Sequence, residues 1–175
     1  NVLRLRAEGH EHGLALDAGQ RFFARLRNDL DEPTLIHWHG LTPPTEQDGV
    51  PHFSQAPLPP GDTYVYEFPV ARPGTNWMHS HVGLQEQRLL AAPLIIRDPA
   101  EVSLDEQEVV VMLHDFTFRN PDEILDELRG GAGGMAGMDH SMMDLNDIAF
   151  DAYLANDRTL DDPEIVRVDS GGRVR

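Results

Sequence analysis

Short segments of alternating apolar and polar residues recur along the first two-thirds of the chain, and they constrain the fold more than any other feature. In RFFARLRN (21–28), the side chains of Phe22, Ala24 and Leu26 share one face, and arginines take the other. Similar segments are VLRLR (2–6), TLIHWH (34–39), TYVYEF (63–68), NWMHSH (76–81), PLIIR (93–97) and EVVVMLHDF (108–116). Turn sequences such as PPGD and RPGT separate them. This pattern favours an all-β sandwich or barrel.

The character of the sequence changes near residue 120. NPDEILDELRGG places Asn120 at a helix cap, Pro121 in the first turn and Gly130 at the end, which predicts a short helix. A glycine- and methionine-rich stretch with the composition of a linker follows. Further strands are predicted in DIAFDAYLAN (147–156) and EIVRV (164–168). We therefore predict a first domain over 1–118, a helix and linker over 119–145, and the opening strands of a second, truncated domain over 146–175.

Two pairs of histidines, each with one residue between its members, lie in two of these predicted strands. Side chains alternate along a strand, so residues two apart point to the same face, about 6.6 Å apart. His37 and His39 therefore share one face while Trp38 packs on the other, and His79 and His81 share a face in the same way. If the two strands are neighbours, four imidazoles converge on one patch. Neutral imidazoles without a carboxylate or thiolate favour copper or zinc over calcium or magnesium.

A single pair of this kind is weak evidence, because histidines on half-buried strands commonly make ordinary hydrogen bonds. Two pairs on predicted strands, each beside a tryptophan and followed by a glycine, favour a shared metal site over that alternative. His10 and His12 have the same spacing, but they lie between glycines with no apolar alternation, so we expect a solvated loop. His114 ends an apolar segment and is expected to be structural, and His52 is expected to be exposed.

The composition excludes several classes of function. Thirty acidic residues against fourteen basic ones give a net charge of −16, which repels nucleic acid and anionic membranes and attracts cations. No apolar run approaches the roughly 20 residues needed to cross a bilayer. The chain has no cysteine, which excludes disulfides, thiolate zinc sites and iron–sulfur clusters. It also excludes a blue-copper site of the usual kind, because that site needs a thiolate.

Several motifs together resemble the N-terminal cupredoxin domain of the multicopper oxidases, in particular the bacterial laccase and copper-resistance type. They are LIHWHGL (35–41), DGVP (48–51), PPGDTYVYEF (59–68) and GTNWMHSHVGLQEQRLLAAPLIIRDP (74–99), with MLHDFTF (112–118) and AYLAND (152–157) also similar. The resemblance implies a cupredoxin-like Greek-key β-barrel or sandwich, with a short helix and the beginning of a second cupredoxin domain. It also implies copper as the cofactor and a location in the periplasm or outside the cell.

Carried over by position, the resemblance assigns roles to five residues. His37 would bind the type 2 copper ion, and His39, His79 and His81 would bind the type 3 pair. These histidines would be half of the ligands of a trinuclear copper cluster that reduces dioxygen to water. Asp48 would help to deliver protons, and the alternative is a plain β-turn aspartate.

The stretch MAGMDHSMMD combines soft thioether ligands with an imidazole. Thioethers favour cuprous copper, and copper-handling relatives carry similar stretches, so a copper-collecting role is one interpretation. A linker with incidental methionines is the other. The candidate ligands are Met135, Met138, His140, Met142 and Met143.

Two functions of different classes follow. The first is the N-terminal portion of a multicopper oxidase that oxidises a phenol, an amine or cuprous ions with dioxygen. Its other cupredoxin domains would lie in the same chain or in another, as in the two-domain type whose sites assemble between the subunits of a trimer. The family's blue-copper cysteine and four further histidines have no counterpart here, so the 175-residue chain alone is expected to be inactive. The alternative is a copper-binding or sequestering module without catalysis.

Overall fold

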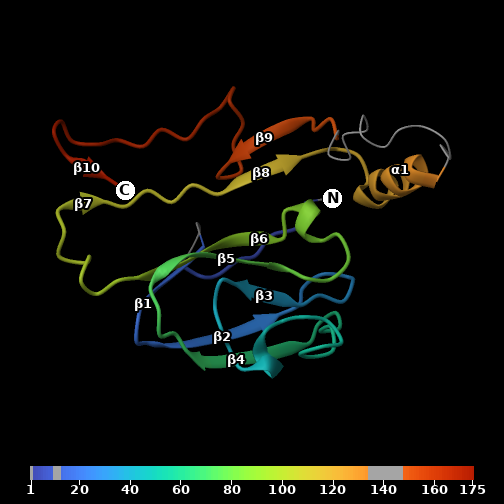
Figure 1. The fold of residues 1–175 in the computed structure, drawn as a ribbon, viewed down its shortest axis with the longest axis horizontal. Helices are drawn as coiled ribbons and strands as arrows, with labels where there is room; N and C mark the ends of the chain where they lie inside the picture. Colours follow the sequence, from blue (N-terminus) through green and yellow to red (C-terminus); the bar gives the residue numbers. More distant parts are fainter. Residues whose placement is uncertain (1, 10–12, 134–147) are drawn as a thin grey trace.

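A computed structural model describes residues 2–9, 13–133 and 148–175 (Figure 1). Its largest sheet has four strands in the order β1–β6–β5–β3, and its other large sheet pairs β2 with β4 in antiparallel fashion. The strands of the first sheet are β1 (Leu14–Asp17), β3 (Ile36–His39), β5 (Gly74–Ser80) and β6 (Ala91–Arg97). Those of the second are β2 (Arg21–Arg27) and β4 (Thr63–Pro69). Within the first sheet, β1 runs parallel to β6, whereas β5 runs antiparallel to β6 and β3.

The two sheets enclose a core of aromatic and branched side chains. Burial alternates in β2 as predicted, since Phe22 is 1% exposed and Phe23 is 63% exposed. The ring of Phe22 stacks on Phe68 of β4 and meets the edge of Trp38 of β3, with centroids 4.8 and 4.6 Å apart. Tyr66 of β4 also lies edge-on to Trp38, at 4.8 Å. These contacts confirm the predicted β-sandwich, and they turn the opposite face of β3 away from the core.

The remaining strands and the α-helix follow β6 along the chain and lie together on one side of the sandwich in Figure 1. β7 (Glu106–Gln107) pairs with β10 (Arg173–Val174), and β8 (Leu113–Phe116) pairs with β9 (Ala152–Ala155). The predicted helix is confirmed as α1 (Pro121–Gly133), and the backbone N–H of Asp122 donates to Asn120 Oδ1 at 3.1 Å. α1 continues past Gly130, because glycine disfavours a helical turn by only about 1 kcal/mol and does not forbid it. No helix among the described residues is long and apolar enough to span a membrane.

Three predicted strands need correction. VLRLR (2–6) forms no strand, although the Leu3 N–H donates to the Arg88 carbonyl at 2.8 Å. EIVRV (164–168) forms none either, and Ile165 is 84% exposed. EVVVMLHDF is a strand only over β8. Alternation makes a segment suitable for a sheet, but a strand forms only where a neighbouring backbone supplies hydrogen bonds. The four-residue β1 was not predicted, because its partner β6 lies far away in the sequence.

Candidate metal centre

β3 and β5 place the two histidine pairs side by side. The strands are antiparallel, with His37 directly opposite His79. Residues opposite each other in such a pair point to the same face, so all four histidines lie on the face turned away from the core. Trp38 between the first two is buried in the core at 3% exposure. His81 follows the end of β5, and its N–H donates to the Leu35 carbonyl at 3.1 Å, which continues the pairing by one residue.

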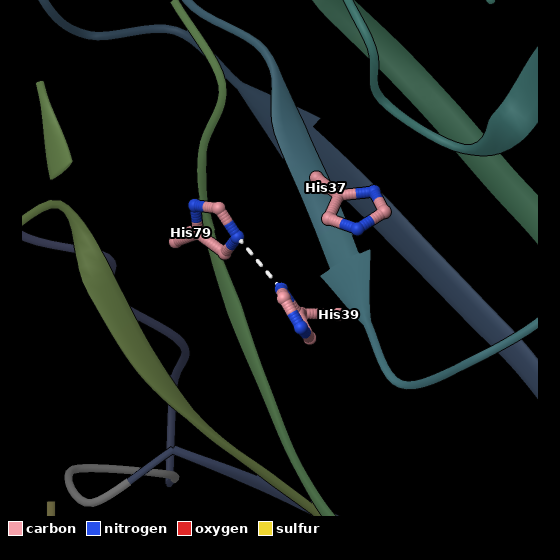
Figure 2. A group of neighbouring side chains, drawn as sticks. All are labelled: His37, His39 and His79. Carbon is pink, nitrogen blue, oxygen red and sulfur yellow. Dashed lines mark hydrogen bonds between the residues drawn. The ribbon is translucent and has the colours of Figure 1, made fainter. Parts of the chain in front are cut away.

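The ring of His37, like that of His79, lies next to the other three histidine rings. The centroid of its ring is 5.6 Å from that of His39, 5.5 Å from that of His79 and 5.6 Å from that of His81. One ring nitrogen each of His37, His39 and His79 lie within 4.8 Å of one another (Figure 2). No other group of three histidine, aspartate or glutamate side chains in the described part of the chain comes together in this way. The structure thus brings the two histidine pairs into one patch.

Main-chain carbonyls and carboxylates together favour one nitrogen of each of two rings as the one that faces the cluster. Nδ1 of His37 lies 2.7 Å from the carbonyl oxygen of Asp48, and Nδ1 of His79 lies 3.0 Å from that of Ser80. A carbonyl only accepts, so Nδ1 carries the hydrogen in both rings and Nε2 keeps a lone pair. Carboxylates lie beside the same nitrogens, with Asp48 Oδ1 at 3.3 Å from His37 and Glu86 Oε2 at 3.0 Å from His79. Both Nε2 atoms are therefore available to a metal ion.

Two of the nitrogens have the spacing of ligands on one ion. Nδ1 of His39 and Nε2 of His79 lie 3.3 Å apart and share a hydrogen bond, which an ion held by both nitrogens would replace (Figure 2). Two metal–imidazole bonds of about 2.0 Å at a tetrahedral angle would place their nitrogens about 3.3 Å apart. Burial lowers the pKa of His79 despite the opposing effect of Glu86, so the ring is neutral near pH 7, as a ligand must be. A neutral, imidazole-only donor set fits copper, and zinc also accepts it.

The two tryptophans next to the histidine pairs pack in different ways. The Trp38 indole lies in the core, and its Nε1–H donates to the Gln47 carbonyl at 3.1 Å. Trp77 lies on the histidine side, stacked on the His79 ring with a centroid distance of 4.1 Å and an interplanar angle of 16°. Its ring is also 5.1 Å from that of His39. Trp77 therefore limits the rotation of the two rings whose nitrogens face each other.

Sequence reasoning missed Gln85 and Glu86, whose side chains contact Ser80 and His79 of the second histidine segment. Gln85 is 4% exposed. Its Oε1 accepts from the Thr34 hydroxyl at 2.7 Å and the Ser80 hydroxyl at 2.6 Å, and its Nε2 donates to the Pro33 carbonyl at 2.9 Å. Gln85 thus links the start of the first histidine segment to the second. The available signal was the hydroxyl side chains of Thr34 and Ser80 close to the two histidine pairs, since buried hydroxyls need a partner.

Replacing Gln85 with leucine is expected to reduce the free energy of unfolding by about 2 kcal/mol, because the buried hydroxyls of Thr34 and Ser80 and the carbonyl of Pro33 lose a hydrogen-bond partner. The matched control is Gln87→Leu, two residues further on, where the side chain is exposed. Its effect should stay within about 0.5 kcal/mol. Urea denaturation of the two variants measures the difference, and equal losses would contradict a structural role for the Gln85 bonds.

The other candidate residues lie apart from the cluster or outside the described residues. His114 is on β8, and burial lowers its pKa although Asp157, Glu86 and Asp115 act in the opposite direction. His52 is exposed in a turn with a positive φ of 61°. His10 and His12 lie outside the described residues, as do the candidate copper-collecting residues Met135, Met138, His140, Met142 and Met143.

Known proteins with similar sequences are copper oxidases and copper-resistance proteins. Residues 12–101 match the family profile described as multicopper oxidase. Copper resistance protein A of Escherichia coli is 45% identical over 113 residues, which is 63% of this chain and 18% of that protein. Laccase-2 of Botryotinia fuckeliana is 39% identical over 122 residues, which is 68% of this chain and 21% of that protein. The chain spans less than a fifth of the length of the copper resistance proteins that it matches.

Solved structures agree with this relationship. The laccase from Botrytis aclada aligns with 82% of this chain and 25% of its own, with a TM-score of 0.63 and 33% identity. The blue copper oxidase from Nitrosomonas europaea aligns with 91% of this chain and 48% of its own, with a TM-score of 0.65 and 26% identity. The predicted cupredoxin-like fold is thereby confirmed. With its paired histidines in the matched region, the chain belongs to the multicopper oxidase family.

Proposed function

We propose that this chain is the N-terminal portion of a multicopper oxidase and supplies half of the histidine ligands of a trinuclear copper cluster. The observation that carries the proposal is the convergence of four imidazoles on the outward face of β3 and β5, around the ring of His37. The exposed edges of His39 and His81 leave that face open to ligands from elsewhere. Those ligands would come from further cupredoxin domains, in the same chain or in another.

Each histidine has a proposed place in the cluster. His37 would hold the type 2 ion through Nε2, because its Nδ1 already donates to the Asp48 carbonyl. His39 and His79, with facing nitrogens 3.3 Å apart, would share one type 3 ion, and His81 would complete this chain's contribution to the pair. When bound, copper would supply the one-electron chemistry that couples substrate oxidation to the four-electron reduction of dioxygen to water.

Asp48 is the proposed proton carrier. Its side chain is 28% exposed, so solvent reaches the carboxylate, and Oδ1 lies 3.3 Å from Nδ1 of His37. Because the carboxylate lies on the Nδ1 side of that ring, it would also keep Nε2 directed into the cluster. A plain turn aspartate would make neither contribution.

The reducing substrate would be a phenol, an amine or cuprous ion, and the location would be the periplasm or the outside of the cell. The division of the chain at residues 118 and 145 also stays a prediction. Its first boundary follows β7 and β8, which pair with β10 and β9 from the last part of the chain.

Oxygen uptake tests the proposed function. A longer form of the protein that carries a cysteine-bearing domain should consume one dioxygen for every four electrons taken from a diamine. His39→Ala in that form should abolish uptake. The copper-loaded 175-residue chain should show no turnover, because a sequence without cysteine has no thiolate copper site through which electrons enter. Robust turnover by the short chain, or full uptake by the variant, would contradict the proposal.

A copper-sequestering module is the second candidate, and the methionine-rich segment favours it. In that case copper would bind through thioethers of residues 135–143, and deleting this segment would remove binding while His79→Ala would not. If His79→Ala removes copper binding and the deletion does not, the result favours the oxidase.

A further inference from the structure

We infer that Glu86 is a positioning residue of the metal centre: its carboxylate holds the His79 ring so that Nε2 faces Nδ1 of His39. The inference deepens the proposed function and rests on it, in that the cluster is taken to bind copper. It assigns Glu86 no contact with the metal itself.

The position of Glu86 is fixed by its neighbour in the chain. Glu86 is the first residue of the 3-10 turn η2 (Glu86–Arg88) and directly follows Gln85, whose three side-chain hydrogen bonds anchor the start of the turn. The turn also closes on itself, because the Leu89 N–H donates to the Glu86 carbonyl at 2.9 Å. An anchored backbone at this point places the Glu86 side chain within reach of His79, although that side chain is itself 37% exposed.

The contact with His79 is well suited to orient a ring. Glu86 Oε2 lies 3.0 Å from His79 Nδ1, and the His79 side chain is only 7% exposed. The Ser80 carbonyl contacts the same nitrogen, but it belongs to the next residue of the same strand. Glu86 approaches from a separate turn and brings a negative charge to within 3.0 Å of that nitrogen, which favours the tautomer with hydrogen on Nδ1. Together with the Trp77 ring stacked on His79, the carboxylate leaves one orientation for Nε2.

The first histidine pair has a matching arrangement. Nδ1 of His37 lies beside both a carbonyl and a carboxylate, which belong to Asp48. One ring of each strand is therefore held through Nδ1 by a carbonyl and a carboxylate together. A carboxylate on the far nitrogen of a ligating histidine fixes its tautomer and strengthens the metal bond, and losing such a partner lowers metal affinity by about 10- to 100-fold.

Two variants and a matched control test the role of Glu86 in the 175-residue chain. Glu86→Ala removes the carboxylate, and Glu86→Gln keeps a side chain of the same shape without the charge. Glu46→Gln is the control, because Glu46 is an exposed acid in the first turn of the other 3-10 turn, η1 (Thr45–Gln47), and its removal changes the net charge equally.

Two measurements are made on each protein. Two-bond ¹H–¹⁵N correlation of the imidazoles in the metal-free chain reports the His79 tautomer, and competition with a chelator reports the Cu(I) dissociation constant. The wild type and Glu46→Gln should show His79 with hydrogen on Nδ1. Glu86→Ala should show a mixture of tautomers and bind Cu(I) at least about tenfold more weakly. Glu86→Gln should keep the tautomer and lose less affinity than Glu86→Ala.

The outcomes separate this inference from the proposed function. A Glu86→Ala chain with the wild-type tautomer and a dissociation constant within twofold of wild type would overturn the role of Glu86. A wild-type chain that binds no Cu(I) through its histidines would overturn the proposed function, while the tautomer comparison would still decide whether Glu86 positions the ring. Circular dichroism confirms that each variant is folded before the comparison is made.

Discussion

Replacing His79 with alanine is expected to weaken Cu(I) binding by the chain by about a hundredfold or more. Loss of a residue that only supports a ligand costs about 10- to 100-fold, and loss of the ligand itself costs more. His79 is central because its Nε2 lies 3.3 Å from Nδ1 of His39 and its ring is next to those of His37 and His81. Without it, His39 loses the partner with which it would share an ion.

The control for this variant is His52→Asn, which also removes one imidazole. His52 lies in an exposed turn with φ of 61°, and asparagine tolerates that backbone conformation better than most residues. Its dissociation constant for Cu(I) should match the wild type. Chelator competition on both variants makes the comparison. Equal affinities of His79→Ala and wild type would mean that copper binds elsewhere in the chain.

Replacing Gly49 with alanine should destabilise the chain by more than about 3 kcal/mol. Gly49 has φ of +74°, and a Cβ atom there would lie 1.8 Å from the carbonyl oxygen of Ile36 and 2.8 Å from the backbone nitrogen of His37. Both atoms belong to the backbone of β3, so the clash is not relieved by turning a side chain. The turn must move away from the strand or the strand must shift, and a shift would also displace His37 from the cluster.

Gly61→Ala separates the steric clash from backbone strain. Gly61 has a similar φ of +81°, but a Cβ atom there would meet nothing within 4 Å. Its cost should be limited to the strain of a left-handed residue, about 1–2 kcal/mol. Chemical denaturation gives both values. If the two alanine variants lose the same stability, the close approach of the turn to β3 is not what requires a glycine at position 49.

The sequence was sufficient to predict those alternating segments that pair with a neighbouring strand, and the face of the sheet to which each of their side chains points. Phe22 and Trp38 point into the core as predicted, and the histidines point away from it. The sequence could not predict the register of β3 against β5. That register matters, because a slip of one residue would have put the two histidine pairs on opposite faces of the sheet. Only the structure sets His37 opposite His79.

The rest of the site depends on contacts between distant parts of the chain. The sequence GLQEQR gives no period that separates Gln85, which is buried, from Gln87, which is exposed. Likewise, nothing in EIVRV or VLRLR indicates that no neighbouring strand pairs with them. A local sequence pattern indicates which secondary structure a segment can form. The burial of Gln85 and the contact of Glu86 with His79 depend instead on parts of the chain that the local pattern does not include.

X-ray absorption at the copper edge of the 175-residue chain, loaded with one equivalent of Cu(I), tests the four-histidine centre most directly. The predicted spectrum has a first shell of nitrogen at about 2.0 Å with outer-shell scattering from at least two imidazoles, and His79→Ala should reduce that scattering. A first shell of sulfur from methionine, or of oxygen without imidazole scattering, would contradict copper binding by the histidines of β3 and β5.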